Sequence, residues 1–306
     1  MPDGCKLKIL GARGSIPVQG EEYLKFGGAT TCYLLKTDTQ ALFIDAGTGI
    51  TLADPAELEG LEISVLLTHP HLDHLAGLPF FPLLMEKGRS VDIYGVDRGG
   101  CTVQEQIDAL YRPPYWPCGL ADYPAEIKYH SISYHAISYQ PQFNSTDVLS
   151  AWKEETLQIG AFAIESMEVP HPGGCTAFRI SAGGEELAVV TDAELPVPYE
   201  AVRREAAVDD TTAFTQVLAS FIADADLMLC DSQYTAEEAK NRRGYGHSTP
   251  ETAIAWQEAA GIRELVLVHH DPKHTDSFLS EYEQRIGRAD VHFARAGEVF
   301  DWTGKL

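Results

Sequence analysis

Four side chains of the kinds that bind transition metals lie within six positions of this chain. The segment Thr68–Gly77 reads T-H-P-H-L-D-H-L-A-G and contains His69, His71, Asp73 and His74. Imidazole and carboxylate together suit zinc, manganese or iron, whereas calcium and magnesium sites are built from oxygen ligands. The segment therefore predicts a transition-metal site, because so dense a group is hard to explain as a polar turn with incidental histidines.

A buried strand is expected to position these ligands. Ile63–Thr68 (I-S-V-L-L-T) is short and rich in branched apolar residues, and a proline soon follows, which indicates a strand that ends in a loop. The ligands thus leave the carboxyl end of a strand, where open α/β sheets usually place their sites. His69 and His71 lie two apart and can point to one side, whereas Asp73 and His74 turn differently and can serve a second ion.

Three later residues can complete a site for two ions. His171 lies in V-P-H-P-G-G, Asp192 in V-V-T-D-A-E and His269 in L-V-L-V-H-H-D-P, each after an apolar run typical of a strand. Ligands at several strand ends can converge on one centre. A hydrolytic pair of ions needs a carboxylate that bridges them, and Asp192 is the candidate for that role.

Composition limits the possible functions. The 306 residues are 44% hydrophobic, and we expect one domain over residues 1–306. A formal net charge of −22 argues against a general nucleic-acid binder, although a local basic patch stays possible. The sequence shows no secretory signal and no apolar run of membrane-spanning length, so we expect a cytoplasmic protein without membrane contact.

The six cysteines have no C-x-x-C spacing and are expected to be free thiols, with Cys175 disfavoured as a ligand.

Apolar strand-like runs alternate with helical stretches along the chain. The expected strands are Lys6–Leu10, Thr31–Lys36, Ala41–Asp45, Ile63–Thr68, Val91–Tyr94, Phe162–Val169, Ala177–Ile180, Leu187–Thr191, Leu227–Cys230 and Leu265–His269. The expected helices are Leu75–Glu86, Thr102–Leu110, Ala213–Ile222, Ala236–Asn241 and Pro250–Ala260. Between them, residues 112–147 form an irregular excursion rich in aromatics and prolines, either a cap over the site or an oligomer contact. His130 and His135 in that excursion are expected to be peripheral.

The motifs together resemble the metallo-β-lactamase-fold hydrolases. H-P-H-L-D-H matches the H-x-H-x-D-H motif of that superfamily, and L-F-I-D-A-G-T-G around Asp45 matches its earlier aspartate motif. The resemblance covers essentially the whole chain. It implies an α/β fold, an αββα sandwich of two mixed β-sheets flanked by helices. It also implies that one ion takes His69, His71 and His171, that the other takes Asp73, His74 and His269, and that Asp192 is shared.

Within this superfamily, the chain is most similar to the ribonuclease Z-like phosphodiesterase branch. That branch adds a histidine in a G-H-S-T turn and an acidic residue upstream, which correspond here to His247 and Asp231. The resemblance implies that His247 protonates the leaving oxygen as a general acid and that Asp231 orients it. The alternative is that G-H-S-T serves as a helix cap, and both roles are compatible because the cap does not use the imidazole.

Other residues have weaker indications. Arg242 and Arg243 lie in a basic loop of an acidic chain and can bind substrate phosphate, or can form a solvated helix end. Asp45 can hydrogen-bond a metal ligand or close its own turn. For the cofactor we expect two divalent ions, zinc first and manganese or iron as alternatives.

The resemblance leaves the substrate open. Cys230–Gln233 reads C-D-S-Q where ribonuclease Z typically has H-E-A-T, and the long basic arm of that enzyme is absent. We therefore expect a small phosphodiester, such as a cyclic nucleotide or a cyclic ribosyl phosphate. The alternatives are a ribonuclease Z-like tRNA 3′-processing endonuclease, a thioesterase of the glyoxalase type and, last, a regulatory metal-binding protein without turnover. The resemblance also implies a homodimer.

Overall fold

The computed structural model describes residues 5–132, 156–198 and 210–301. The chain divides into two compact units, and each is described by itself. Unit 1 contains residues 1–133, 272–277 and 294–306, and unit 2 contains residues 134–271 and 278–293. Every inferred metal ligand lies in one unit or the other, so the description of the fold follows the two units.

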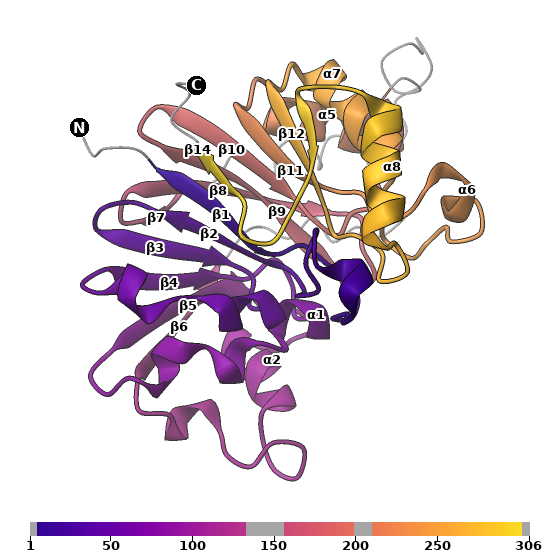
Figure 1. Cartoon of the computed structure of the whole chain (residues 1–306). Helices are drawn as coiled ribbons and strands as arrows, with labels where there is room; N and C mark the ends of the chain where they lie inside the picture. Colours follow the sequence, from indigo (N-terminus) through magenta and orange to yellow (C-terminus); the bar gives the residue numbers. More distant parts are fainter. Residues whose placement is uncertain (1–4, 133–155, 199–209, 302–306) are drawn as a thin grey trace. The chain divides into compact units, whose positions relative to one another are not determined.

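Unit 1 is built on a seven-stranded mixed sheet (Figure 1). The central strands β3, β4, β5 and β6 are parallel, and β14, β1 and β2 join them in antiparallel pairs. In spatial order, the strands are β14 (Val299–Asp301), β1 (Lys6–Gly11), β2 (Cys32–Lys36), β3 (Gln40–Ile44), β4 (Glu62–Leu66), β5 (Ser90–Val96) and β6 (Glu126–Ile132). Strands β3 and β4 are parallel, so their carboxyl ends lie next to each other. Asp45 and Thr68 follow these ends and therefore lie close together.

Unit 2 repeats this arrangement with a second seven-stranded mixed sheet. Strands β10 to β13 are parallel, and β7, β8 and β9 continue as antiparallel neighbours. In spatial order, the strands are β13 (Val291–Phe293), β12 (Glu264–Val268), β11 (Leu227–Asp231), β10 (Glu185–Val190), β9 (Cys175–Ala182), β8 (Phe162–Val169) and β7 (Leu157–Ile159). Because β10, β11 and β12 are parallel, Asp192, Asp231 and His269 all lie where the carboxyl ends of these strands meet.

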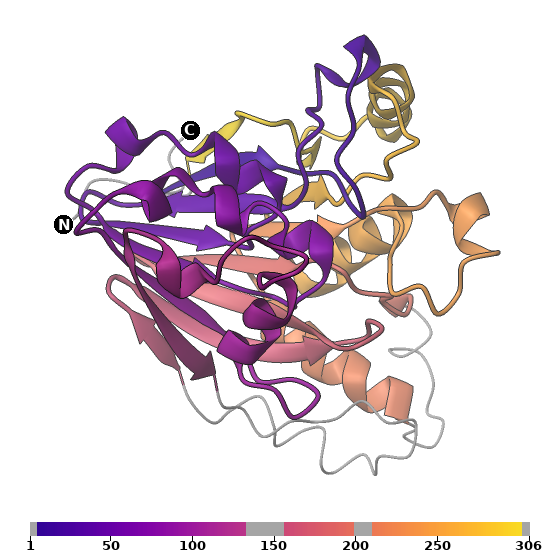
Figure 2. The ribbon, with the colours of Figure 1, turned by 90° about the horizontal axis from the view of Figure 1, so that it is seen from below.

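Helices cover the sheets. In unit 1, short helical turns together with α1 (Leu72–Leu75) and α2 (Val103–Leu110) lie over the sheet (Figure 2), and α2 packs on β5 and β6. In unit 2, α7 (Pro250–Ala260) packs on β11 and β12 and against α5 (Asp210–Ile222). The remaining helices are α6 (Ala236–Ala239) and α8 (Asp276–Ile286).

The start of α7 shows how the sequence fixes an element beside the site. The Thr249 side chain accepts a hydrogen bond from the Thr252 amide, and Pro250 occupies the first turn, where its missing N–H costs nothing. The helix ends at Gly261 in the left-handed conformation (φ 70°). The G-H-S-T segment therefore does cap a helix, and His247 precedes that cap.

The ten strands expected from the sequence are all present, whereas one expected helix is wrong. Leu75–Glu86 does not form a continuous helix, because Pro79 and Pro82 interrupt the ladder of hydrogen bonds. Each proline instead opens a short 3-10 turn, at Leu78–Phe80 and at Pro82–Met85. The other four expected helices correspond to α2, α5, α6 and α7.

The two mixed sheets with their helices confirm the expected fold class. Part of the segment marked as irregular is regular, since Glu126–Ile132 forms β6 at the edge of the unit 1 sheet. Residues 133–147 of that excursion, including His135, lie outside the described residues. Within the described part of the chain, no helix combines the length and apolar character needed to cross a membrane.

Candidate metal centre

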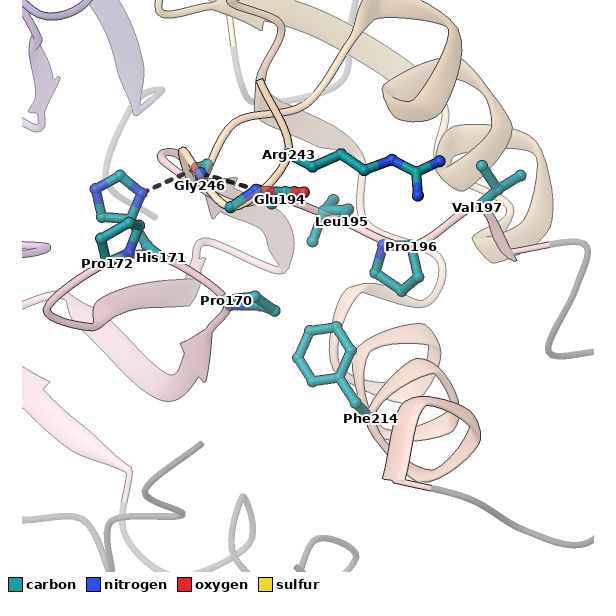
Figure 3. Close-up of a pocket in the computed structure, with 11 residues that line it drawn as sticks. Pro170, His171, Pro172, Glu194, Leu195, Pro196, Val197, Phe214, Arg243 and Gly246 are labelled. Atoms are coloured by element: carbon teal, nitrogen blue, oxygen red, sulfur yellow. Dashed lines mark hydrogen bonds between the residues drawn. The ribbon is translucent and has the colours of Figure 1, made fainter. Parts of the chain in front are cut away.

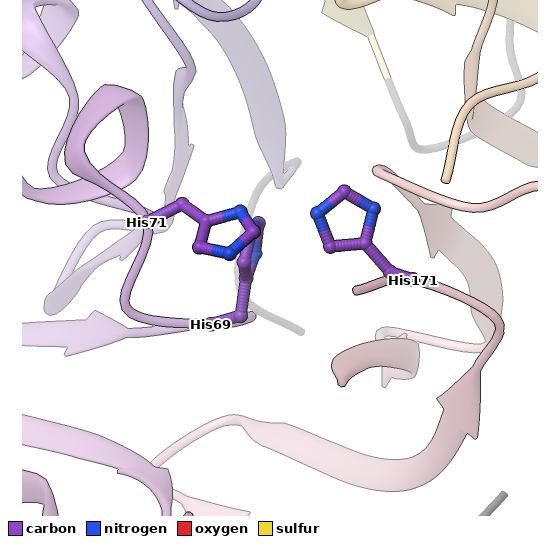
Figure 4. Close-up of side chains that lie close together, drawn as sticks. All are labelled: His69, His71 and His171. Carbon is purple, nitrogen blue, oxygen red and sulfur yellow. The ribbon is translucent and has the colours of Figure 1, made fainter. Parts of the chain in front are cut away.

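Unit 1 gathers four of the inferred ligands just beyond β4. His69 is buried, His71 is exposed, and Asp73 and His74 are buried in the single turn of α1. The His69 ring centroid lies 4.3 Å from that of His71 and 4.2 Å from that of His74. Figure 4 shows His69 and His71 side by side on this loop, and it also draws His171 on its own loop after β8. The loop thus presents several imidazole nitrogens to one small volume.

Asp45 fixes the orientation of His74. Its Oδ2 lies 2.7 Å from His74 Nδ1, and its Oδ1 accepts the Thr68 amide at 2.8 Å. A carboxylate can only accept, so Nδ1 carries the proton and the lone pair of His74 Nε2 is available to a metal. Burial raises the pKa of the Asp45 carboxyl, and its hydrogen bonds with His74 and Thr68 oppose that rise.

A backbone amide that sequence reasoning did not identify holds Asp73. The Ser15 N–H donates to Asp73 Oδ2 at 2.7 Å, and Ser15 has a left-handed backbone (φ 63°). The same Oδ2 lies 3.5 Å from His74 Nε2. One oxygen of Asp73 therefore faces the imidazole nitrogen that is available for ligation.

Unit 2 gathers the other three inferred ligands at the ends of β8, β10 and β12. Asp192 Oδ2 lies 3.2 Å from His269 Nε2 and 3.9 Å from His171 Nε2, with all three side chains buried. His171 Nδ1 donates to the Gly246 carbonyl at 2.9 Å, which leaves its Nε2 lone pair toward Asp192. One carboxylate oxygen thus faces two imidazole Nε2 atoms, so three donor atoms of metal-ligand type lie together.

Strained backbone accompanies these residues. Asp45, Asp192 and His269 all follow strands and all have positive φ, at 61°, 46° and 61°. Non-glycine residues rarely adopt this region, and such strain is concentrated at functional sites. The turn redirects each side chain at the strand end, a feature that no residue pattern in the sequence indicates.

His247 and Asp231 form a hydrogen-bonded pair beside the unit 2 cluster. His247 Nδ1 lies 2.8 Å from Asp231 Oδ2, and the buried Asp231 also accepts the amides of Ala193 and Gln233 at 3.1 and 2.9 Å. The His247 ring stacks on His269 with centroids 4.8 Å apart. One nitrogen or oxygen atom from each of His171, Asp192 and His247 lies within 4.8 Å of the others. The imidazole is therefore held close to the inferred ligands by a carboxylate.

The two arginines of the basic loop have different surroundings. Arg242 Nη1 lies 3.2 Å from Asp271 Oδ2, and its guanidinium covers the Tyr234 ring at 4.5 Å. Arg243 instead lines a cavity of about 780 Å³ that begins at His171 (Figure 3). Glu194 holds the loop, because its Oε2 accepts the amides of Gly244 and Gly246 at 2.7 and 3.1 Å.

His130, which was expected to be peripheral, and the cysteines make contacts with residues other than the inferred ligands. His130 pairs with Asp92 on β5 at 2.6 Å and stacks on Tyr94. All six cysteines are free thiols, as expected. Cys175 is buried with its Sγ 3.4 Å from the Thr191 carbonyl, and it belongs to no cluster of metal-ligand type among the described residues.

The donor set fits divalent transition metals. In His74 and His171, the Nδ1 atom is engaged by an acceptor, so that Nε2 is the free donor atom. The carboxylates Asp73 and Asp192 each direct one oxygen toward such a nitrogen. Mixed imidazole and carboxylate donors match zinc, manganese or iron.

Comparison with known proteins places the chain in a family. A family profile described as the β-lactamase superfamily domain matches residues 41–270. The chain belongs to this family. The match spans all seven inferred ligands, and it makes this chain a hydrolase of the metallo-β-lactamase superfamily, as the sequence motifs predicted.

Three relatives illustrate the range within this family. A ribonuclease Z from Bradyrhizobium diazoefficiens is 24% identical over 92% of this chain and 94% of its own length. A probable metallo-hydrolase, YhfI, from Bacillus subtilis is 23% identical over 98% of this chain and 100% of its own length. Its crystal structure superposes on this chain with a TM-score of 0.65, over 97% of this chain and 99% of its own. The structure of a diphosphatase from the PhnP family, 14% identical, gives a TM-score of 0.63 over 97% of both chains. These structures share the fold with this chain.

Proposed function

We propose that this protein is a two-metal phosphodiesterase that cleaves a small phosphodiester. Unit 1 contributes His69, His71, Asp73 and His74, and unit 2 contributes His171, Asp192 and His269. Asp192 is the shared ligand, because one of its oxygens faces two imidazoles within its own unit. Two divalent ions bound by these ligands would polarise the phosphoryl group and lower the pKa of an attacking water.

The single observation that carries the proposal is the His247–Asp231 pair next to the ligand cluster. Asp231 accepts the Nδ1 proton of His247, so the other ring nitrogen of the protonated imidazole can donate to an oxygen. Cleaving a phosphodiester leaves an alkoxide that must be protonated, whereas hydrolysis with a stable leaving anion needs no such donor. Since His247 stacks on one inferred ligand and lies near two others, a phosphodiester bound at these ligands would lie beside this imidazole.

A small substrate fits the charge better than RNA does. Attraction or repulsion by surface charge extends over a Debye length of about 8–10 Å at ordinary salt, and the net charge of −22 opposes a polyanion. The second candidate is RNA cleavage, which the name of the relative from Bradyrhizobium favours. A thioesterase is the third candidate, because the ligand set alone does not identify the substrate.

One panel of assays separates these candidates. Purified protein is loaded with zinc or manganese, its metal is counted by elemental analysis, and it is given bis-p-nitrophenyl phosphate, 2′,3′-cyclic nucleotides, precursor tRNA and a glutathione thioester. We expect two ions per chain and a kcat/KM for a small diester above that for the RNA. A higher value for the RNA at physiological salt would identify an endonuclease, and turnover of the thioester alone would refute a phosphodiesterase.

The shared ligand has its own test. Asp192→Asn should lower the metal content below two ions per chain and abolish most turnover, because the amide replaces an anionic ligand with a neutral one. Asp38 is an exposed aspartate on a loop of unit 1 and offers a charge-matched control. Asp38→Asn should keep both ions, whereas full metal content in Asp192→Asn would refute the bridging role. The homodimer expected from the resemblance is checked by light scattering on the same samples.

A further inference from the structure

The cavity that begins at His171 is larger than hydrolysis of a phosphate group requires. Its volume of about 780 Å³ lies within the range of ligand pockets, roughly 300–1,000 Å³, that enclose a whole small molecule. All of its lining residues belong to unit 2. One end contains the inferred ligand His171, and the cavity extends from there along the segment Glu194–Val197 to Phe214 and Arg243.

Between His171 and Arg243 the side chains that line this cavity are apolar apart from Glu194, and hydrogen bonds hold Leu195 and Pro196 in place. The Leu195 amide donates to Ser248 Oγ, just before the cap of α7, at 3.0 Å, and the Pro196 carbonyl accepts Trp256 Nε1 on α7 at 2.8 Å. Phe214 on α5 is largely buried. Figure 3 shows the rings of Phe214, Pro170 and Pro196 around the same space. Flat apolar faces of this kind suit a planar aromatic ring.

A cation without a protein partner lies at the rim. Arg243 is exposed, and within residues 5–132, 156–198 and 210–301 its guanidinium has neither a hydrogen bond nor an ion pair. Its neighbour Arg242 is already bound to Asp271. Figure 3 shows the Arg243 side chain extending toward Val197, away from His171. A guanidinium is well matched to a phosphate through two parallel hydrogen bonds.

We propose that this cavity binds a nucleotide-like part of the substrate that has a second anionic group. The planar base packs against Phe214, the second phosphate binds Arg243, and the reacting phosphodiester lies at the His171 end. This assignment rests on the proposed phosphodiesterase function, which supplies the phosphate at the metal ligands. It makes Arg243 and Phe214 specificity-determining residues and makes Arg242 a structural one.

Binding of product-like probes to the metal-loaded protein tests the assignment by calorimetry. Adenosine 3′,5′-bisphosphate, adenosine 5′-monophosphate and ribose 5-phosphate differ in the second phosphate and in the base. We expect the bisphosphate to bind about tenfold more tightly than the monophosphate, the value of one charge-assisted contact. We also expect the monophosphate to bind more tightly than ribose 5-phosphate.

Two variants assign those preferences to residues. Arg243→Ala should remove the preference for the bisphosphate, and Phe214→Leu should reduce the preference for the base while retaining an apolar wall. Arg112 is exposed and lines no part of the cavity, so Arg112→Ala should keep both preferences. Thermal melting shows whether each variant is folded.

The outcomes show whether the proposed binding site is wrong or the proposed phosphodiesterase function is wrong. An unchanged bisphosphate preference in folded Arg243→Ala refutes the anion contact, and equal binding of ribose 5-phosphate and the monophosphate refutes the base site. Absence of hydrolysis of bis-p-nitrophenyl phosphate by the metal-loaded wild type would instead refute the phosphodiesterase function. That substrate has no second anionic group and does not depend on the base site.

Discussion

Replacement of Asp45 by asparagine should weaken metal binding without unfolding the protein. Asp45 has a φ of 61°, a region that asparagine tolerates better than most residues, so the backbone keeps its turn. The volume is unchanged as well. The substitution therefore changes the hydrogen bonds to Thr68 and His74 and leaves the packing as it is.

The asparagine has two orientations, and both harm the site. If its oxygen accepts the Thr68 amide, then its NH₂ group faces His74 Nδ1, and the histidine must move its proton to Nε2, the atom that would bind metal. If the amide is reversed, two donors face each other at Thr68 in a buried position, which costs about 1–3 kcal/mol. Loss of such a supporting contact typically reduces metal affinity about 10–100-fold, or roughly 1.4–2.7 kcal/mol.

The assay is a zinc titration against a chromophoric chelator, compared with Asp38→Asn. His74 belongs to only one of the two inferred ligand sets, so one of the two binding steps should weaken while the other stays close to wild type. If folded Asp45→Asn binds zinc as tightly as the wild type in both steps, then Asp45 only closes its turn. Equal weakening of both steps would contradict the division of ligands between two ions.

Two further substitutions test the loop that contains the proposed acid. His247→Ala should retain both ions and lose about 10²–10⁴-fold in kcat on alkyl phosphodiesters but much less on nitrophenyl esters, which need no proton. The control is His130→Ala, which removes a histidine that pairs with Asp92 and is not an inferred ligand. An equal loss on both substrate types would indicate a structural role. Gly246→Ala should lower zinc affinity, because its Cβ would collide with the His171 ring and with Pro172. Gly244 has a similar positive φ (82° against 84°) but open space around it, so Gly244→Ala should bind zinc normally. Similar zinc affinities in the two glycine variants would show that this contact does not position His171.

The strands and the candidate ligands could be predicted because they have local signatures. Buried parallel strands are short apolar runs. A ligand-type residue directly after such a run lies at the carboxyl end of a strand, whatever the rest of the chain does. The omissions are elements without that signature. Helix α8 is mostly polar and buries only Leu279 and Tyr282, and β6 is an edge strand with no fully buried residue. Strands β13 and β14 have three residues each, too few for a period to be recognised.

The contacts that orient the ligands are invisible in the sequence for a different reason. Ser15 reaches Asp73 across 58 positions, and Glu194 reaches Gly244 across 50, through backbone amides that every non-proline residue has. Residue type therefore gives no indication of which amide is used. The same holds for Arg242 and Arg243, whose identical side chains have different surroundings because Asp271 and Tyr234 lie beside Arg242.

These long-range contacts connect the proposed acid with a proposed ligand. Glu194 fixes the amides of Gly244 and Gly246, the Gly246 carbonyl accepts the His171 Nδ1 proton, and the next residue is His247. A shift of this loop would therefore move the acid and reorient His171 together. Because Glu194 comes only two residues after Asp192, the same strand end provides the proposed shared ligand and the anchor of the loop. The position of the proposed acid relative to the inferred ligands of unit 2 therefore depends on one strand end, where Asp192 has a positive φ of 46°.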